Sequence, residues 1–166
     1  MSKIEPRVSS AFQAAEVSPR TRRRRSPSRQ SLEALKQVPL FAGLSTRHLR
    51  RLSGLADHVR YGAGRTVVQN GSRGTAFFVI LDGEAKVMAG YSNRAFARLG
   101  PGDFFGELAL LDGGPRSASV VATSPLATLR IPRAAFRKML RSEPDIALKI
   151  LEELSQRLRR KRSATE

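Results

Sequence analysis

One stretch of the chain places an acid and a base around a short turn of backbone. Glu107 directly follows Gly106, and Arg116 comes nine residues after the acid. A carboxylate accepts hydrogen bonds from hydroxyl groups, and a guanidinium pairs with two oxygens of one phosphate. The same three residues could equally form an ordinary surface ion pair beside a turn glycine. The order of the surrounding residues decides between these two interpretations.

The string from Phe104 to Val120 resembles the phosphate-binding cassette of cyclic-nucleotide-binding domains. The resemblance is carried by Phe-Gly-Glu-Leu-Ala-Leu followed by Arg-Ser-Ala-Ser-Val at a fixed distance. It implies that Glu107 accepts a hydrogen bond from the ribose 2′-OH and that Arg116 binds the phosphate as a planar fork. It also implies that Gly106, which lacks a Cβ, lets the backbone approach the sugar. The implied ligand-binding residues are Phe105, Gly106, Glu107, Leu108, Ala109, Arg116, Ser117 and Ala118.

Free backbone amides and one serine complete the implied site. The segment 108–111 is expected to form one helical turn whose unpaired N–H groups face the anion, and Ala118 would add another N–H. In similar domains the residue after the cassette arginine helps to choose the base. Ser117 at that position favours cyclic AMP over cyclic GMP. These nucleotides are the expected ligands, and neither a cofactor nor a metal is expected.

Composition limits the other function classes. The chain has 166 residues, of which 40% are hydrophobic, enough for one domain with a core. It has no cysteine, which excludes disulfides and cysteine nucleophiles, and its two histidines, His48 and His58, have no metal-binding or acid–base spacing. We therefore expect no enzyme and no catalytic residue. The sequence has no stretch near the ~20 apolar residues of a membrane span and no signal-like run, so a cytoplasmic protein is expected.

Residues 1–30 are predicted to be a disordered basic tail. They carry eight basic and two acidic groups, or +6 of the total charge of +16, and the run 22–25 is all arginine. Such a segment cannot bury a core. It could bind nucleic acid or an acidic partner, or it could be a solubilising tail.

Residues 31–166 are predicted to form the cyclic-nucleotide-binding domain. Ser31 is expected to cap a short helix that runs through Gln37, and Ser45 to cap a second helix. Leu49, Leu52 and Leu55 share one face of the second helix. The preceding string Pro-Leu-Phe-x-Gly-Leu-Ser is similar to the entry of many such domains.

Seven short apolar runs punctuated by glycine occupy about residues 57–131, and they predict strands. The runs are 57–61, 66–69, 75–81, 84–89, 95–99, 117–122 and 127–131. The expected fold class is α+β, an antiparallel, jelly-roll-like β-roll flanked by N-terminal helices and two C-terminal helices. One position departs from the family pattern, because Ser72 stands where relatives often have an acidic residue.

The C-terminal helices are expected over about residues 132–162. Pro132 is placed in the first turn of one helix, and Ser142 with Asp145 resembles a capping box for the next. Ala147, Leu151, Leu154 and Leu158 form an apolar stripe. In the family the final helix covers the pocket as a lid and, in dimeric members, pairs with its counterpart. Packing onto the chain's own β-roll is the alternative.

The sequence therefore predicts a cyclic-nucleotide sensor, a regulatory protein for signal transduction. Only four residues follow Arg162, so a stand-alone sensor is expected, with output through an effector protein, a homodimer formed by the final helix, or the basic tail. The alternative is a β-roll scaffold that binds no nucleotide and attaches to nucleic acid or acidic partners through its basic surface.

Overall fold

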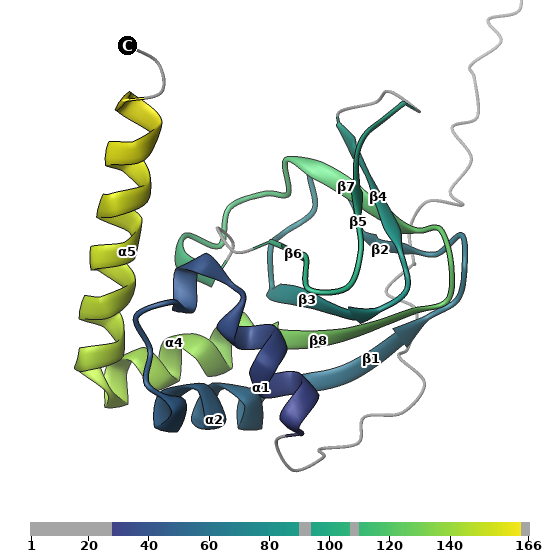
Figure 1. The fold of residues 1–166 in the computed structure, drawn as a ribbon. Coiled ribbons are helices and arrows are strands. Elements are labelled where there is room, and N and C mark those ends of the chain that lie inside the picture. The colour runs from purple at the N-terminus through teal and green to yellow at the C-terminus, as the bar shows by residue number, and fades with distance from the viewer. Residues whose placement is uncertain (1–27, 90–93, 107–109, 164–166) are drawn as a thin grey trace, which may run out of the picture.

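The computed structural model describes residues 28–89, 94–106 and 110–163, and these form a β-roll flanked by helices (Figure 1). The β-roll consists of two four-stranded antiparallel sheets. This arrangement confirms the predicted α+β class. The predicted tail lies almost entirely outside the described residues.

From residue 28 on, three short helices precede the sheets: α1 (Arg29–Lys36), the 3-10 helix η2 (Pro39–Phe41) and α2 (Thr46–Leu55). The prediction of Ser31 as the first cap is wrong, since the side chain of Ser28 accepts the capping bond from the backbone N–H of Ser31. Ser31 is fully buried inside α1, and its hydroxyl lies 3.3 Å from Nε2 of His58. Ser45 caps α2 as predicted.

Strands that are distant in the sequence lie next to each other in both sheets. The first sheet contains, in spatial order, β1 (Asp57–Tyr61), β8 (Leu126–Pro132), β3 (Ala76–Asp82) and β6 (Phe104–Phe105). The second contains, in spatial order, β2 (Thr66–Val68), β7 (Ala118–Ala122), β4 (Ala85–Ala89) and β5 (Ala95–Leu99). All seven predicted strands are present within one or two residues. Of the strands in the described ranges, β6 alone was not predicted, because two residues are too few to show a period.

Strand β3 separates the two hydrophobic cores. Its alternate side chains point to opposite faces, as in any strand. Phe77 and Val79 join the core under the helices, whereas Phe78 and Ile80 join the core inside the β-roll. Burial on both faces explains why β3 is a continuous apolar run in the sequence.

Two helices follow the sheets: α4 (Arg133–Ser142) and α5 (Pro144–Ser163). Two details differ from the prediction. Pro132 is the extended N-cap of α4 and does not lie in its first turn. Ser142 does not cap α5, because it is the last residue of α4 and its hydroxyl donates to the carbonyl of Met139. The chain turns at Glu143, and α5 starts at Pro144.

The first turns of α5 hold it to the domain. Ile146 and Ile150 are buried in the core, whereas Leu151 and Leu158 are 58% and 64% exposed. Packing of the predicted stripe onto the chain's own β-roll is therefore wrong for Leu151 and Leu158. In Figure 1, α5 rises beside the β-roll and does not cross it. Its outer apolar face is open in the described part of the chain.

Candidate ligand-binding site

Arg116 is the central residue of the candidate site. It lies just before β7 and its side chain is only 8% exposed. Its Nη2 donates to the carbonyl of Ala76 at 2.5 Å, and its guanidinium carbon lies 6.0 Å from the ring centroid of Phe78. Among the described residues, its buried Nη1 has no hydrogen-bond partner. Burial removes water from the cation and lowers the pKa of Arg116 below its ordinary value.

A buried guanidinium with a free terminal nitrogen is costly, because a charge taken out of water needs a partner. An anion at Nη1 would provide that partner. Arginine stays protonated at any physiological pH, so this charge cannot be removed by titration. The geometry thus favours binding of a negatively charged group at Arg116.

Backbone hydrogen bonds from a neighbouring loop fix the position of Arg116 in the chain. Its N–H donates to the carbonyl of Ser72 at 2.8 Å, and its own carbonyl accepts from the N–H of Gly71 at 2.7 Å. Ser72 is the residue that departs from the family pattern. The contact between this loop and the cassette is nevertheless present, since it uses backbone groups.

Gly106 lies directly against this guanidinium. Its φ is +80°, and a Cβ added there would overlap Nη1 of Arg116 and lie 3.2 Å from the carbonyl oxygen of Ala76. Both the backbone conformation and the available space therefore require glycine. Gly106, expected from sequence to approach the sugar, thus also lies against Arg116.

The other predicted site residues lie in different surroundings. Phe105 is buried, pairs with Phe78 between β6 and β3, and stacks on its ring at 5.0 Å, so its side chain belongs to the core. Ser117 is exposed, and Ala118 starts β7 opposite Ala89. Glu107, Leu108 and Ala109 lie outside the described residues. Of the predicted helical turn, Leu110 and Leu111 are helical.

Sequence reasoning missed Ala76 and Phe78 as parts of the site. Ala76 contributes only its carbonyl oxygen, which every residue has, and Phe78 was one apolar residue in a run of them. Neither contribution leaves a residue-type signal in the sequence. Both contacts arise because the tertiary structure places β3 beside Arg116.

Comparison with known proteins identifies the architecture. The family model for the cyclic nucleotide-binding domain matches residues 58–143, just over half of the chain. The chain belongs to the cyclic nucleotide-binding domain family. This membership supports cyclic-nucleotide sensing. The family is a binding and regulatory one rather than a catalytic one, which favours a protein that is not an enzyme.

Several relatives show the same relationship. The cAMP-dependent protein kinase regulatory subunit of Aspergillus fumigatus is 37% identical over 112 residues, covering 68% of this chain and 27% of that protein. The N-terminal domain of a transcriptional regulator from Streptomyces coelicolor has a TM-score of 0.74 at 28% identity, covering 79% of this chain and 96% of that one. The catabolite activator protein of Thermus thermophilus has a TM-score of 0.62 at 31% identity, covering 76% and 61% respectively. The chain spans about a quarter of the length of the curated regulatory subunits that it matches.

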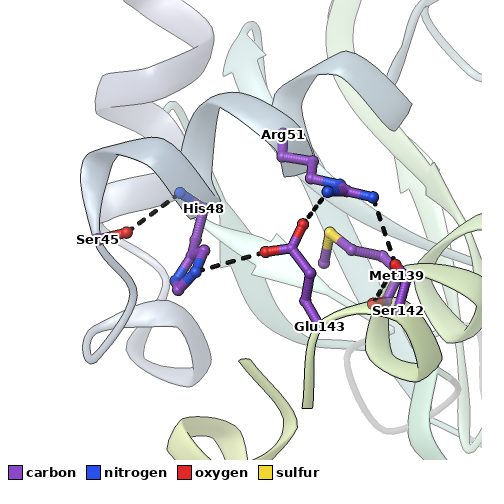
Figure 2. A network of polar contacts seen from close by, with 6 residues as sticks. All are labelled: Ser45, His48, Arg51, Met139, Ser142 and Glu143. Carbon is purple, nitrogen blue, oxygen red and sulfur yellow. Dashed lines mark hydrogen bonds and ion pairs between the residues drawn. The ribbon is translucent and has the colours of Figure 1, made fainter. Parts of the chain in front are cut away.

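A polar network in this cyclic nucleotide-binding domain holds the junction between α4 and α5 (Figure 2). Glu143, between the two helices, forms an ion pair with Arg51 of α2. Its Oε2 lies 3.5 Å from Nε2 of His48, which is also on α2. Nη2 of Arg51 also lies 3.3 Å from the hydroxyl oxygen of Ser142. The side chains of His48 and Glu143 are each 14% exposed, so this network is shielded more than a surface ion pair. It fixes the point from which α5 starts.

Both histidines thus contact residues that belong to the packing of the helices and strands. His48 belongs to this network, and His58 lies beside the buried Ser31. Across 28–89, 94–106 and 110–163 no cluster of three or more His, Cys, Asp or Glu residues could hold a metal ion. Over the same ranges no helix is long and apolar enough to cross a membrane.

Proposed function

We propose that this domain binds a 3′,5′-cyclic mononucleotide at Arg116, cyclic AMP in preference to cyclic GMP. The observation that supports it is a buried guanidinium next to a glycine of positive φ, whose Nη1 has no hydrogen-bond partner among the described residues. One cyclic phosphodiester charge would complete the pairing of Arg116. Glu107 would accept a hydrogen bond from the ribose hydroxyl, and Ser117 would face the base. The preference for cyclic AMP agrees with the cAMP-dependent kinase subunits among the relatives.

The proposed output passes through an effector protein or through oligomerisation, in the cytoplasm. A scaffold that binds no nucleotide is the second candidate, and the net charge of +16 favours it. Against it stands Arg116, because a scaffold would gain nothing from a buried cation whose Nη1 has no partner within the part of the chain that the structure describes. A gel-shift assay with unrelated DNA and RNA, with and without cyclic AMP, separates the two candidates.

The binding proposal predicts a ligand-dependent gain in thermal stability. At 100 times its dissociation constant, cyclic AMP should add about 2.7 kcal/mol to the unfolding free energy, measured by thermal shift beside cyclic GMP and cyclic di-GMP.

Glu107→Ala should weaken cyclic AMP binding by about 1.5 to 3 kcal/mol in calorimetry, since a charged hydrogen bond is lost. Absence of any shift or heat with every cyclic mononucleotide at millimolar concentration would contradict the proposal.

The exposed leucines of α5 predict an effect on association. We propose a homodimer through Leu151 and Leu158, whose apolar surface is otherwise in water. Analytical ultracentrifugation should find a dimer that becomes a monomer when both are replaced by lysine. Gln156→Lys, an exposed polar position on the same helix, adds charge without removing apolar surface and should leave the dimer intact. A monomeric wild type would refute the dimer. If the wild type is a monomer, faster nucleotide dissociation from the variant with Leu151 and Leu158 replaced by lysine would support a role of α5 as a lid.

A further inference from the structure

A second arginine lies against the cassette and has no role in the proposed ligand contacts. Arg133 is the first residue of α4, directly after β8. Its guanidinium lies on the backbone of Gly113, where an added Cβ would be 2.7 Å from Cζ and 2.9 Å from Nε of Arg133. The Nε atom is buried and, within the described part of the chain, has no hydrogen-bond partner. Among the described residues, the contact that places this side chain is therefore its packing on the backbone of Gly113.

Gly113 belongs to the turn that leads into Arg116. Its φ is +65°, and the carboxylate of Asp112 accepts a hydrogen bond from the N–H of Gly114 at 2.8 Å. The carbonyl of Gly114 in turn accepts from the N–H of Gly74 at 3.2 Å. Two residues later the chain reaches Arg116. A planar group pressed on Gly113 thus limits where this turn, and the arginine after it, can lie.

Both arginines also donate hydrogen bonds to backbone carbonyls near the start of β3. The backbone N–H of Arg133 donates to the carbonyl of Thr75 at 2.8 Å, and the side chain of Arg116 donates to the carbonyl of Ala76, the next residue. Arg133 therefore contacts two segments next to Arg116: the residue just before β3, whose first carbonyl accepts the bond from the guanidinium of Arg116, and the turn that precedes Arg116. A shift of α4 would reach Arg116 through both contacts.

We propose that Arg133 is a positioning residue for the anion site, acting through Gly113 on the turn that places Arg116. The proposal rests on the proposed nucleotide binding. It gives Gly113 a second reason to be glycine, since any side chain there would displace the guanidinium of Arg133. The proposal also means that the first residue of α4 helps to position the anion site, so that a movement of α4 would change the position of Arg116.

The first test compares matched arginine variants of the full chain. Arg133→Met keeps much of the aliphatic stem but removes the planar group, and Arg137→Met removes an exposed arginine from the same helix. We expect Arg133→Met to weaken cyclic AMP binding about tenfold, the size of a typical contact-coupling energy, with Arg137→Met unchanged. Arg133→Lys should not restore affinity, because lysine supplies charge without a flat surface. Full rescue by lysine, or wild-type affinity in Arg133→Met, would overturn the proposal.

A double-mutant cycle tests the route through Gly113. Gly113→Ala should weaken cyclic AMP binding about tenfold in the wild type but only about threefold in Arg133→Ala, where the overlap is gone and backbone strain remains. Gly102→Ala is the control, since Gly102 has a φ of +87° with nothing within 4 Å of an added Cβ. It should show no coupling to Arg133. If the loss of cyclic AMP affinity in the double variant equals the product of the two single losses, within about twofold, the coupling is refuted.

A ligand-free measurement separates this inference from the binding proposal. Hydrogen exchange of the amides of Gly114 and Arg116 should be about tenfold faster in Arg133→Met than in Arg137→Met, because the turn loses its support. Equal exchange rates would overturn the positioning role whatever the ligand. A wild type that binds no cyclic nucleotide would instead refute the proposed function, and the role of Arg133 would then be decided by exchange alone.

Discussion

Replacing Arg116 with methionine is expected to abolish most nucleotide affinity without unfolding the domain. The variant leaves the cyclic phosphate without its charged partner, which should cost about 2 to 5 kcal/mol, or roughly 30- to several-thousand-fold in the dissociation constant. The ligand-free fold loses the bond to Ala76 but also loses a buried charge whose Nη1 has no partner among residues 28–89, 94–106 and 110–163. These opposing effects should leave its unfolding free energy within about 1 kcal/mol of wild type. Calorimetry and urea denaturation measure the two quantities separately.

Arg73→Met provides the control for this variant. Arg73 is exposed, and its backbone pairs with Pro115 of the cassette, so the substitution removes a nearby positive charge without changing the side chain of Arg116. Its effect on affinity should be small and should fade with added salt, because exposed charges are screened. If Arg73→Met and Arg116→Met weaken binding equally, general attraction to a basic surface explains the affinity, and the assignment of Arg116 is wrong.

Replacing Gly106 with alanine is expected to damage both stability and binding. Alanine at a φ of +80° costs about 1 to 2 kcal/mol of unfolding free energy through backbone strain. Its Cβ also takes the space of Nη1 of Arg116, so the guanidinium must move away from Ala76 and from the anion. Affinity should fall about tenfold to a hundredfold, as expected when a charged hydrogen bond of about 1.5 to 3 kcal/mol is displaced.

Gly64→Ala separates strain from overlap. Gly64 has the same φ of +80° as Gly106, but an added Cβ there has nothing within 4 Å. It should therefore show the loss of stability in urea denaturation and no loss of nucleotide affinity. Equal affinity in Gly106→Ala and wild type would show that the space beside Nη1 is not used for binding.

Local patterns determined much of this protein from sequence alone. The cassette string indicated the family, alternating apolar runs and glycines predicted seven strands, and Ser45 marked the start of α2. These features are short-range, because a strand period, a turn or a cap depends on residues within a few positions of each other. Where two serines lay three residues apart, the pattern misplaced the cap, since burial of Ser31 beside His58 is a tertiary effect.

The tertiary structure decided which partners these elements have. The guanidinium of Arg116 bonds to a carbonyl 40 residues away, and Arg51 contacts Ser142 across 91 residues. On α5, apolar residues occupy more than one face. Of the predicted stripe, Leu154 packs against the core whereas Leu151 and Leu158 stay exposed, and the core also takes Ile146 and Ile150. The face of α5 that carries Ile146 and Ile150 lies against the core, and Glu143, which contacts Arg51 and His48 of α2, directly precedes this helix. Such long-range contacts depend on how the elements pack in three dimensions, which local periodicity does not encode.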